Sequence, residues 1–171
     1  MNKINGVVIG IVKNLDDPKK LGRIEVAFPW LSETNKSYWA RIATTMAGAN
    51  RGTWFMPEKE DEVLVAFERD DPDHPYIIGF LWNGEDKPPS KQVRDRMIRS
   101  KNGHMIRFLD STPNEGNLGG LVIEDGHGNR IVMANGKIKI KSTVVLEIEA
   151  PTICLQGPGY KRIVSPNNNP I

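Results

Sequence analysis

Residues 138–150 alternate apolar and polar side chains with a period of two, and this feature constrains the fold most. The apolar positions share one parity, with Ser142 as the polar exception, and are Ile138, Ile140, Val144, Leu146, Ile148 and Ala150. Lysines and glutamates occupy most positions between them. The pattern predicts a strand of about 14 residues with one buried face, longer than most globular strands. At Pro151 the phase changes, and Ile153 and Leu155 continue on the other parity.

Shorter alternating runs precede this stretch, and each follows a glycine. They begin at Gly103, Gly128 and Gly136, and the last two glycines are eight residues apart, which suggests a winding repeat. Strands with a single apolar face cannot bury that face alone, and they leave unpaired edges. Either the strands fold back onto the rest of the chain, or identical chains wrap round a shared axis. We favour the shared axis, with these axial candidates: Ile138, Ile140, Leu146, Ile148, Ile153 and Leu155.

The first half of the chain also reads as β-structure. Short strand-like runs lie between turn-rich segments at residues 6–13, 22–28, 38–43, 62–68 and 76–81. Five short strands in so small a region predict a closed or partly closed barrel, of which the OB-fold is one case. Polar residues with Pro88 and Pro89 then form a linker. We expect an all-β chain with an OB-fold barrel at 1–84, a linker at 85–96 and a β-helix spike at 97–171.

The amino-acid composition restricts the possible functions less than the pattern of residues along the chain does. Hydrophobic residues make up 39% of the 171, which is low for a chain that closes its core alone. The first 85 residues carry 10 Lys or Arg against 13 Asp or Glu, so the barrel is not basic. The single cysteine, Cys154, lies in an apolar run and is expected to be a buried, inert thiol. The first six residues lack the apolar core of a signal peptide, and no stretch is apolar enough to span a bilayer.

Candidate catalytic and metal-binding residues each have a simpler explanation. His74, His104 and His127 fall in expected loops or corners, without ligand spacing. The acids around Asp71 lack the spacing of a calcium loop, so a solvated hairpin loop is expected. The acids at 58–62 form a solvated face or an interface rather than a glycosidase pair. The tryptophans Trp30, Trp39, Trp54 and Trp82 are expected in the core or at an interface.

Several motifs, taken in order, resemble the family of baseplate assembly protein V and VgrG-type central spikes of contractile phage tails and injection systems. The resemblance covers about residues 5–84 through Asp17-Pro18, residues 21–26, Phe28-Pro29-Trp30, Trp39-Ala40-Arg41, Ala47-Gly48, Gly52, residues 55–58, residues 61–68 and residues 71–79. Residues 103–106 and 125–131 resemble the same family's needle.

The resemblance implies an OB-like barrel, a homotrimer and a triangular β-helix needle. It implies a baseplate hub protein above the barrel and a target membrane in front of the needle on firing. Only residues 85–96 separate barrel and needle, too few for the lysozyme domain of some relatives. No His-x-His tip motif is present, so the tip is metal-free or capped by a PAAR-type protein. Without a signal peptide, synthesis is expected in the cytoplasm and residence in the assembled baseplate.

The sequence therefore favours a non-enzymatic spike that punctures an envelope mechanically when a sheath contracts, with no catalytic residue, metal, cofactor or nucleic-acid partner. The alternative is a single-stranded nucleic-acid binding module of the OB type with a β-rich tail. A cell-wall hydrolase is the third hypothesis. The polar tail at residues 165–171 is either disordered or a docking end for a tip protein. The kind of machine, its cargo and its target cell stay open.

Overall fold

The computed structural model describes residues 4, 6–31, 37–111 and 118–164. The expected docking tail at 165–171 lies outside this range. The chain divides into two compact units, Met1–Pro88 and Pro89–Ile171. The division falls within the expected linker, although β8 (Asp95–Arg99) takes up the last two linker residues. The boundaries expected from the sequence themselves remain a prediction.

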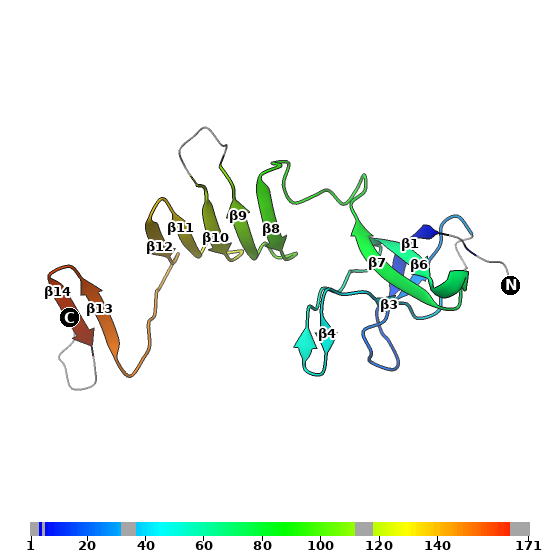
Figure 1. Ribbon diagram of the computed structural model, residues 1–171, viewed down its shortest axis with the longest axis horizontal. Helices are drawn as coiled ribbons and strands as arrows, with labels where there is room; N and C mark the ends of the chain where they lie inside the picture. Colours follow the sequence, from blue (N-terminus) through cyan, green and yellow to red (C-terminus); the bar gives the residue numbers. More distant parts are fainter. Residues whose placement is uncertain (1–3, 5, 32–36, 112–117, 165–171) are drawn as a thin grey trace. The chain divides into compact units, whose positions relative to one another are not determined.

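All regular structure in the described residues is β-strand, apart from one short 3-10 turn at Glu68–Asp70 (Figure 1). Among these residues there is no helix of the length and apolarity that a membrane crossing requires. The chain is therefore all-β, as the frequent glycines and prolines predict.

The first unit is a five-stranded sheet that closes on itself. Its strands are β1 (Val7–Asn14), β2 (Glu25–Ala27), β3 (Arg41–Ile42), β6 (Glu62–Phe67) and β7 (Pro75–Leu81), in the order β2-β1-β6-β7-β3. The pair β3–β7 is parallel and the other pairs are antiparallel. Ile24 and Ala40 exchange two backbone hydrogen bonds of 2.9 and 2.7 Å, which join the two ends of the sheet. The result is a small closed barrel.

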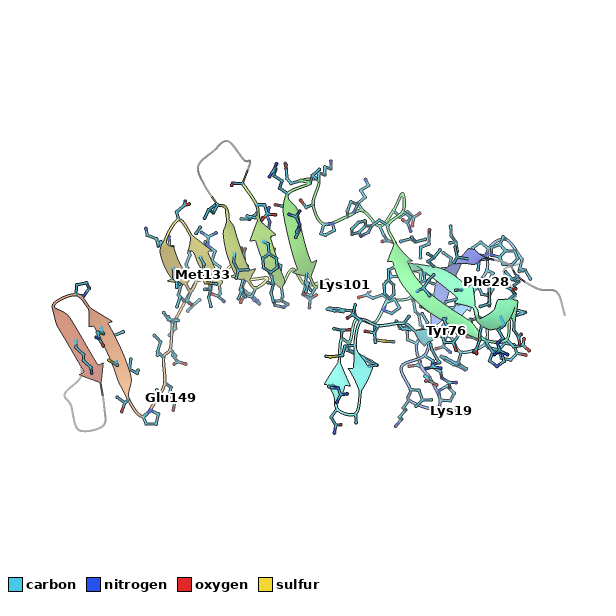
Figure 2. The ribbon with its side chains drawn as sticks, viewed as in Figure 1. Lys19, Phe28, Tyr76, Lys101, Met133 and Glu149 are labelled. Atoms are coloured by element: carbon cyan, nitrogen blue, oxygen red, sulfur yellow. The ribbon has the colours of Figure 1, made fainter. Side chains whose placement is uncertain are left out.

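The barrel encloses the buried apolar core of the described residues. Strand β6 shows the cause, because Val63, Val65 and Phe67 are buried while the residues between them are half-buried. The remaining core cluster consists of Val12, Ile24, Val26, Phe28, Ala40 and Ile77. Figure 2 shows Phe28 within this unit, where its ring lies 5.8 Å from that of Phe67. A short hairpin of β4 (Ala47–Gly48) and β5 (Arg51–Gly52) completes the unit.

The second unit is an open antiparallel meander followed by a hairpin. The meander runs β8, β9 (Met105–Leu109), β10 (Gly120–Glu124), β11 (Arg130–Ala134) and β12 (Lys137–Lys141), each strand paired with the next. The hairpin pairs β13 (Ile153–Gly157) with β14 (Tyr160–Val164). Strands β8 and β12 are the free edges of the five-stranded sheet. Within one chain, these strands form a flat layer rather than a helix that winds on itself.

The expected continuous strand over 138–150 is wrong, because β12 ends at Lys141. The chain bends at Thr143 and Val144, where side chains replace the ladder partners. The Asn129 Oδ1 atom accepts hydrogen bonds from the backbone N and the Oγ1 of Thr143, at 2.8 and 3.0 Å. Ser142 Oγ donates to the carbonyl of Val145 at 2.6 Å. Such side-chain bonds to backbone groups compete with a β-ladder.

Candidate assembly surface

A row of isoleucines crosses the C-terminal sheet, one from each strand. The cross-strand register places Ile98 opposite Ile106, Ile106 opposite Ile123, Ile123 opposite Ile131, and Ile131 opposite Ile140. Directly opposed residues of antiparallel strands point to the same face of a sheet. The five side chains therefore form one unbroken ladder.

A second apolar row runs beside the isoleucines of β9 to β12, two residues along each strand, and β8 carries Arg96 at this position. Its registered pairs join Phe108 to Leu121, Leu121 to Met133, and Met133 to Ile138. Since a shift of two residues keeps a side chain on the same face, both rows share one side of the sheet. We call these nine residues the apolar face. Figure 2 marks Met133 in this sheet.

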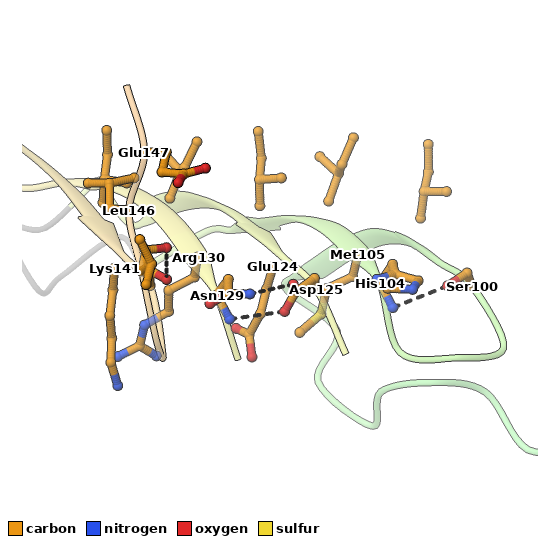
Figure 3. Close-up of a pocket in the computed structure, with 17 residues that line it drawn as sticks. Ser100, His104, Met105, Glu124, Asp125, Asn129, Arg130, Lys141, Leu146 and Glu147 are labelled. Carbon is orange, nitrogen blue, oxygen red and sulfur yellow. Dashed lines mark hydrogen bonds between the residues drawn. The ribbon is translucent and has the colours of Figure 1, made fainter. Parts of the chain in front are cut away.

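The apolar face is left open to solvent in a single chain. The isoleucine ladder is between 37% and 56% exposed, and Ile138 is 69% exposed. All five ladder residues line one groove, which Val145 and Leu146 border (Figure 3). A contiguous apolar surface of this kind marks an interaction site in soluble proteins. The face is therefore a candidate interaction surface.

Apart from Arg96, the charged residues of the strands lie on the opposite side of the sheet. Arg107 Nη2 donates to Asp95 Oδ2 at 2.6 Å, and Ser90 Oγ donates to the same oxygen at 2.7 Å. These hydrogen bonds, with Ser90 the larger influence, lower the pKa of Asp95 below its ordinary value. Three lysines of β12, Lys137, Lys139 and Lys141, also point away from the apolar face.

The loops at one end of the sheet are fixed by side-chain hydrogen bonds. Asp125 accepts from the backbone N of His127 and Asn129, and from Asn129 Nδ2 at 2.7 Å. The Asn129 side chain is the main cause of the lowered pKa of Asp125. The backbone N of Gly126 donates to His104 Nδ1 at 3.2 Å. These contacts hold the ends of β9, β10 and β11 in register.

The six axial candidates are distributed over three segments. Ile138 and Ile140 lie on the apolar face in β12. Leu146 and Ile148 lie in the extended segment before β13, and Ile153 and Leu155 lie in β13 itself. One chain does not bring the six together, so their meeting at an axis stays a prediction.

The sequence pattern did not single out the isoleucines of strands β8 to β11, which are Ile98, Ile106, Ile123 and Ile131. All four have an apolar neighbour on the opposite face, in Met97-Ile98, Met105-Ile106, Val122-Ile123 and Ile131-Val132. These neighbours hide the period of two. The recurrence of one isoleucine near the middle of every strand was the available signal.

In the described barrel residues, the tryptophans are not core residues. Trp30, Trp54 and Trp82 are 52%, 72% and 69% exposed, and Trp39 is half-buried. The expectation of core tryptophans is wrong, because aliphatic residues and two phenylalanines fill this narrow barrel. Trp54 and Phe55 instead line a surface groove with Phe80, Arg41 and Arg51. Their placement leaves the interface interpretation open.

Cys154 is exposed in the single chain, so the expected buried thiol is also wrong at this level. The backbone register pairs position 154 with position 163 in the β13–β14 hairpin, and that hairpin has no covering layer in the described part of the chain.

The histidines lie in turns and corners. His74 Nδ1 is 3.1 Å from Asp71 Oδ2 in the loop before β7, and His127 is largely exposed. No group of three potential metal ligands occurs among the described residues. In the cluster at 58–62, Glu60 pairs with Lys13 at 2.6 Å, while Asp61 accepts from the backbone N of Glu58. Both contacts are structural, since each ties an acid of this cluster to a neighbouring side chain or backbone group.

The closed barrel with its parallel β3–β7 pair defines the first unit as an OB-type domain. Residues 8–82 match the family described as the type VI secretion system/phage-baseplate injector OB domain. The chain belongs to this VgrG-type baseplate family.

The similar proteins include two spike proteins and a toxin. The chain is 31% identical over 120 residues to the type VI secretion system spike protein VgrG5 of Pseudomonas aeruginosa, which covers 68% of this chain and 14% of that protein. It is 39% identical over 72 residues to VgrG1a of the same organism, covering 40% of this chain and 11% of the relative. It is 35% identical over 72 residues to the actin cross-linking toxin VgrG1 of Vibrio cholerae, covering 40% of this chain and 7% of the toxin. The chain thus spans a small part of these relatives.

Proposed function

We propose that the protein is the central spike of a contractile injection system or phage-like baseplate, and that it acts as a homotrimer. Membership of the injector OB-domain family and the likeness to VgrG spike proteins support a role in such an apparatus. Residence in the assembled baseplate follows from that role.

The uncovered apolar face is the main observation that supports the proposal of a trimeric needle. A five-strand sheet with one open apolar face and two free edges cannot be a stable end state for a soluble chain. Three copies arranged about an axis cover all three faces at once, with the isoleucine ladders facing inward. A closed arrangement of this kind also leaves a rigid rod, which is what mechanical puncture demands.

The proposed mechanism is mechanical and uses no catalytic residue. Sheath contraction drives the rod through the target envelope, and the dry axis resists unfolding under load. The barrel is proposed to seat against a hub protein, with its exposed Trp54 and Phe55 available as anchors. The needle end carries its own tip or binds a PAAR-type tip protein.

Light scattering on the purified chain tests the oligomer. The expected mass is three times the 19.2 kDa of one chain, independent of concentration in the micromolar range. A monomer at these concentrations would contradict the proposal, because it would show that the isoleucine ladder is stable without partner copies.

A further inference from the structure

The segment of residues 144–150, between β12 and β13, has the pattern of a strand, but in the described part of the chain no strand lies beside it. We call it the exchange segment. No backbone N–H of residues 145–150 donates to another described residue. Its apolar side chains are open, with Val144 90%, Leu146 54% and Ile148 62% exposed. In Figure 2 this part of the chain, marked by Glu149, runs as a single extended strand of backbone.

Across a two-residue turn, the chain's own β12 is out of register with the exchange segment. If the chain reversed directly at Ser142 and Thr143, Lys141 would oppose Val144, and Lys139 would oppose Leu146. Opposed residues share a face, so Leu146 would join the lysine side and Glu147 would join the apolar face. The tightest hairpin is therefore disfavoured, and the chain bends away at residues 143–144, where Thr143 is held by Asn129.

The charges of the two elements are complementary. Strand β12 presents Lys139 and Lys141 on the side away from its isoleucines, along a free edge. The exchange segment presents Glu147 and Glu149 on the side away from Leu146 and Ile148. Within the part of the chain that the structure describes, none of these four side chains forms an ion pair or a hydrogen bond.

We propose that the exchange segment of one copy pairs with the free edge of β12 in a second copy. Leu146 and Ile148 would then continue the rows of Ile138 and Ile140. Glu147 and Glu149 would lie beside Lys139 and Lys141, where opposite charges on adjacent strands are favourable. The pairing rests on the proposed trimer and assigns its chain exchange to one segment and one edge.

Rotational symmetry sets the direction of the pairing. In the proposed trimer, each chain leaves β12 at its C-terminal end and turns a corner at residues 142–143. It then continues round the axis in the same rotational direction and reaches the β12 of the next copy, which runs in that direction too. The two strands are therefore parallel. Strand β8 is the poorer edge for the exchange segment, since the side that would face Glu147 and Glu149 carries one acid and one base, Asp95 and Arg99, where β12 carries only lysines.

Disulfide trapping tests the pairing in the full chain. Lys139→Cys and Glu147→Cys are introduced together in a Cys154→Ser background, which removes the native thiol. Adjacent strands bring opposed Cα atoms within the span of a disulfide. Under mild oxidation we expect covalent dimers and trimers on a non-reducing gel, because each copy links to its neighbour.

Two control pairs make the outcome specific. Lys139→Cys with Leu146→Cys places the thiols on opposite faces, and it should give less than a tenth of the covalent product. Arg99→Cys with Glu147→Cys probes the β8 edge, and efficient trapping of that pair would overturn the assignment. Equal trapping of the Leu146 and Glu147 pairs would also overturn it.

Light scattering of the unoxidised variants distinguishes a failure of the strand pairing from a failure of trimer formation. A trimer that traps none of the designed pairs contradicts the exchange segment and leaves the spike proposal standing. A monomer contradicts both. As a second readout, Glu147→Lys with Glu149→Lys should shorten the trimer half-life at elevated temperature at least tenfold. Adding Lys139→Glu with Lys141→Glu should restore it, and failure of this rescue would contradict the charge pairing.

Discussion

Ile131 of β11 lies directly opposite Ile140 of β12, and no further strand lies beyond Ile140 in the described part of the chain. The ladder of isoleucines therefore ends at an open edge, on an open face. A soluble protein rarely keeps both features uncovered, because strand edges and apolar faces each recruit other chains. The relationship between these two residues is thus the starting point for tests of assembly.

Replacing the middle of the ladder should block assembly. Ile131→Asp puts one carboxylate per chain at the proposed axis, where three like charges would be desolvated together. We expect a monomer by light scattering, where the unchanged protein gives a trimer. The matched control is Arg130→Asp, which introduces the same residue one position away on the opposite face. A trimer of Ile131→Asp as heat-resistant as the parent would show that this face does not line the axis.

The exchange segment should be as sensitive as the sheet. Ile148→Asp or Leu146→Asp places the same charge at axial candidates that lie outside the five-stranded sheet. We expect loss of the trimer with the barrel still folded, as judged by tryptophan fluorescence. All four tryptophans lie between residues 30 and 82, so this signal reports the first unit alone. A stable trimer of either variant would remove that residue from the axis.

The alternation of residues predicted strands well where one face was plainly polar. Residues 137–141 are the example, since isoleucines and lysines alternate there. Strand β8 was not predicted, because Met97 and Ile98 are both apolar and the proline-rich segment before them suggested a linker. Strand β10 was missed for a similar reason, as Leu121, Val122 and Ile123 form an unbroken apolar run.

The end of β12 could not be predicted from the pattern. Parity continues from Ile140 through Ser142 to Val144, so the period of two gives no sign of a break. The break comes from a long-range contact, the Asn129 amide 14 positions upstream of Thr143. Side-chain contacts between distant residues leave no trace in a local pattern, and the same limit hid the cross-strand alignment of Ile98 with Ile106.

Gly126 should tolerate no side chain. A Cβ atom at this position would lie 2.3 Å from the backbone oxygen of Asn102, so the main chain itself would have to shift. We expect Gly126→Ala to destabilise the second unit by about 1–3 kcal/mol, as strained backbone substitutions do. Thermal unfolding followed by far-ultraviolet circular dichroism measures the change. Gly84→Ala is the control, because a Cβ atom added there would have no other atom within 4 Å. Equal stability of the two variants would contradict the close approach at Gly126.

The loop between β1 and β2 should make the barrel sensitive to acid. Asp17 is nearly buried and accepts two hydrogen bonds from the Arg23 guanidinium, at 2.6 and 3.0 Å, and others from the backbone N–H groups of Lys19, Leu21 and Arg23. The Arg23 side chain is the main cause that holds the pKa of Asp17 well below its ordinary value.

A carboxyl group whose pKa is lowered by folding stabilises the protein fully above its unfolded pKa, about 3.9, and loses that effect as the pH falls towards the folded value. We therefore expect the stability of the barrel to fall steeply below pH 4, measured by urea unfolding with tryptophan fluorescence. Asp17→Asn should be less stable at pH 7 and should show a shallower decline below pH 4. Some decline should persist, because Asp71 also has a lowered pKa. Lys13→Ala breaks an exposed pair with Glu60 and serves as the control, since surface pairs contribute little. An identical acid profile for Asp17→Asn and the parent would show that the loop carboxylate does not govern the barrel's acid sensitivity.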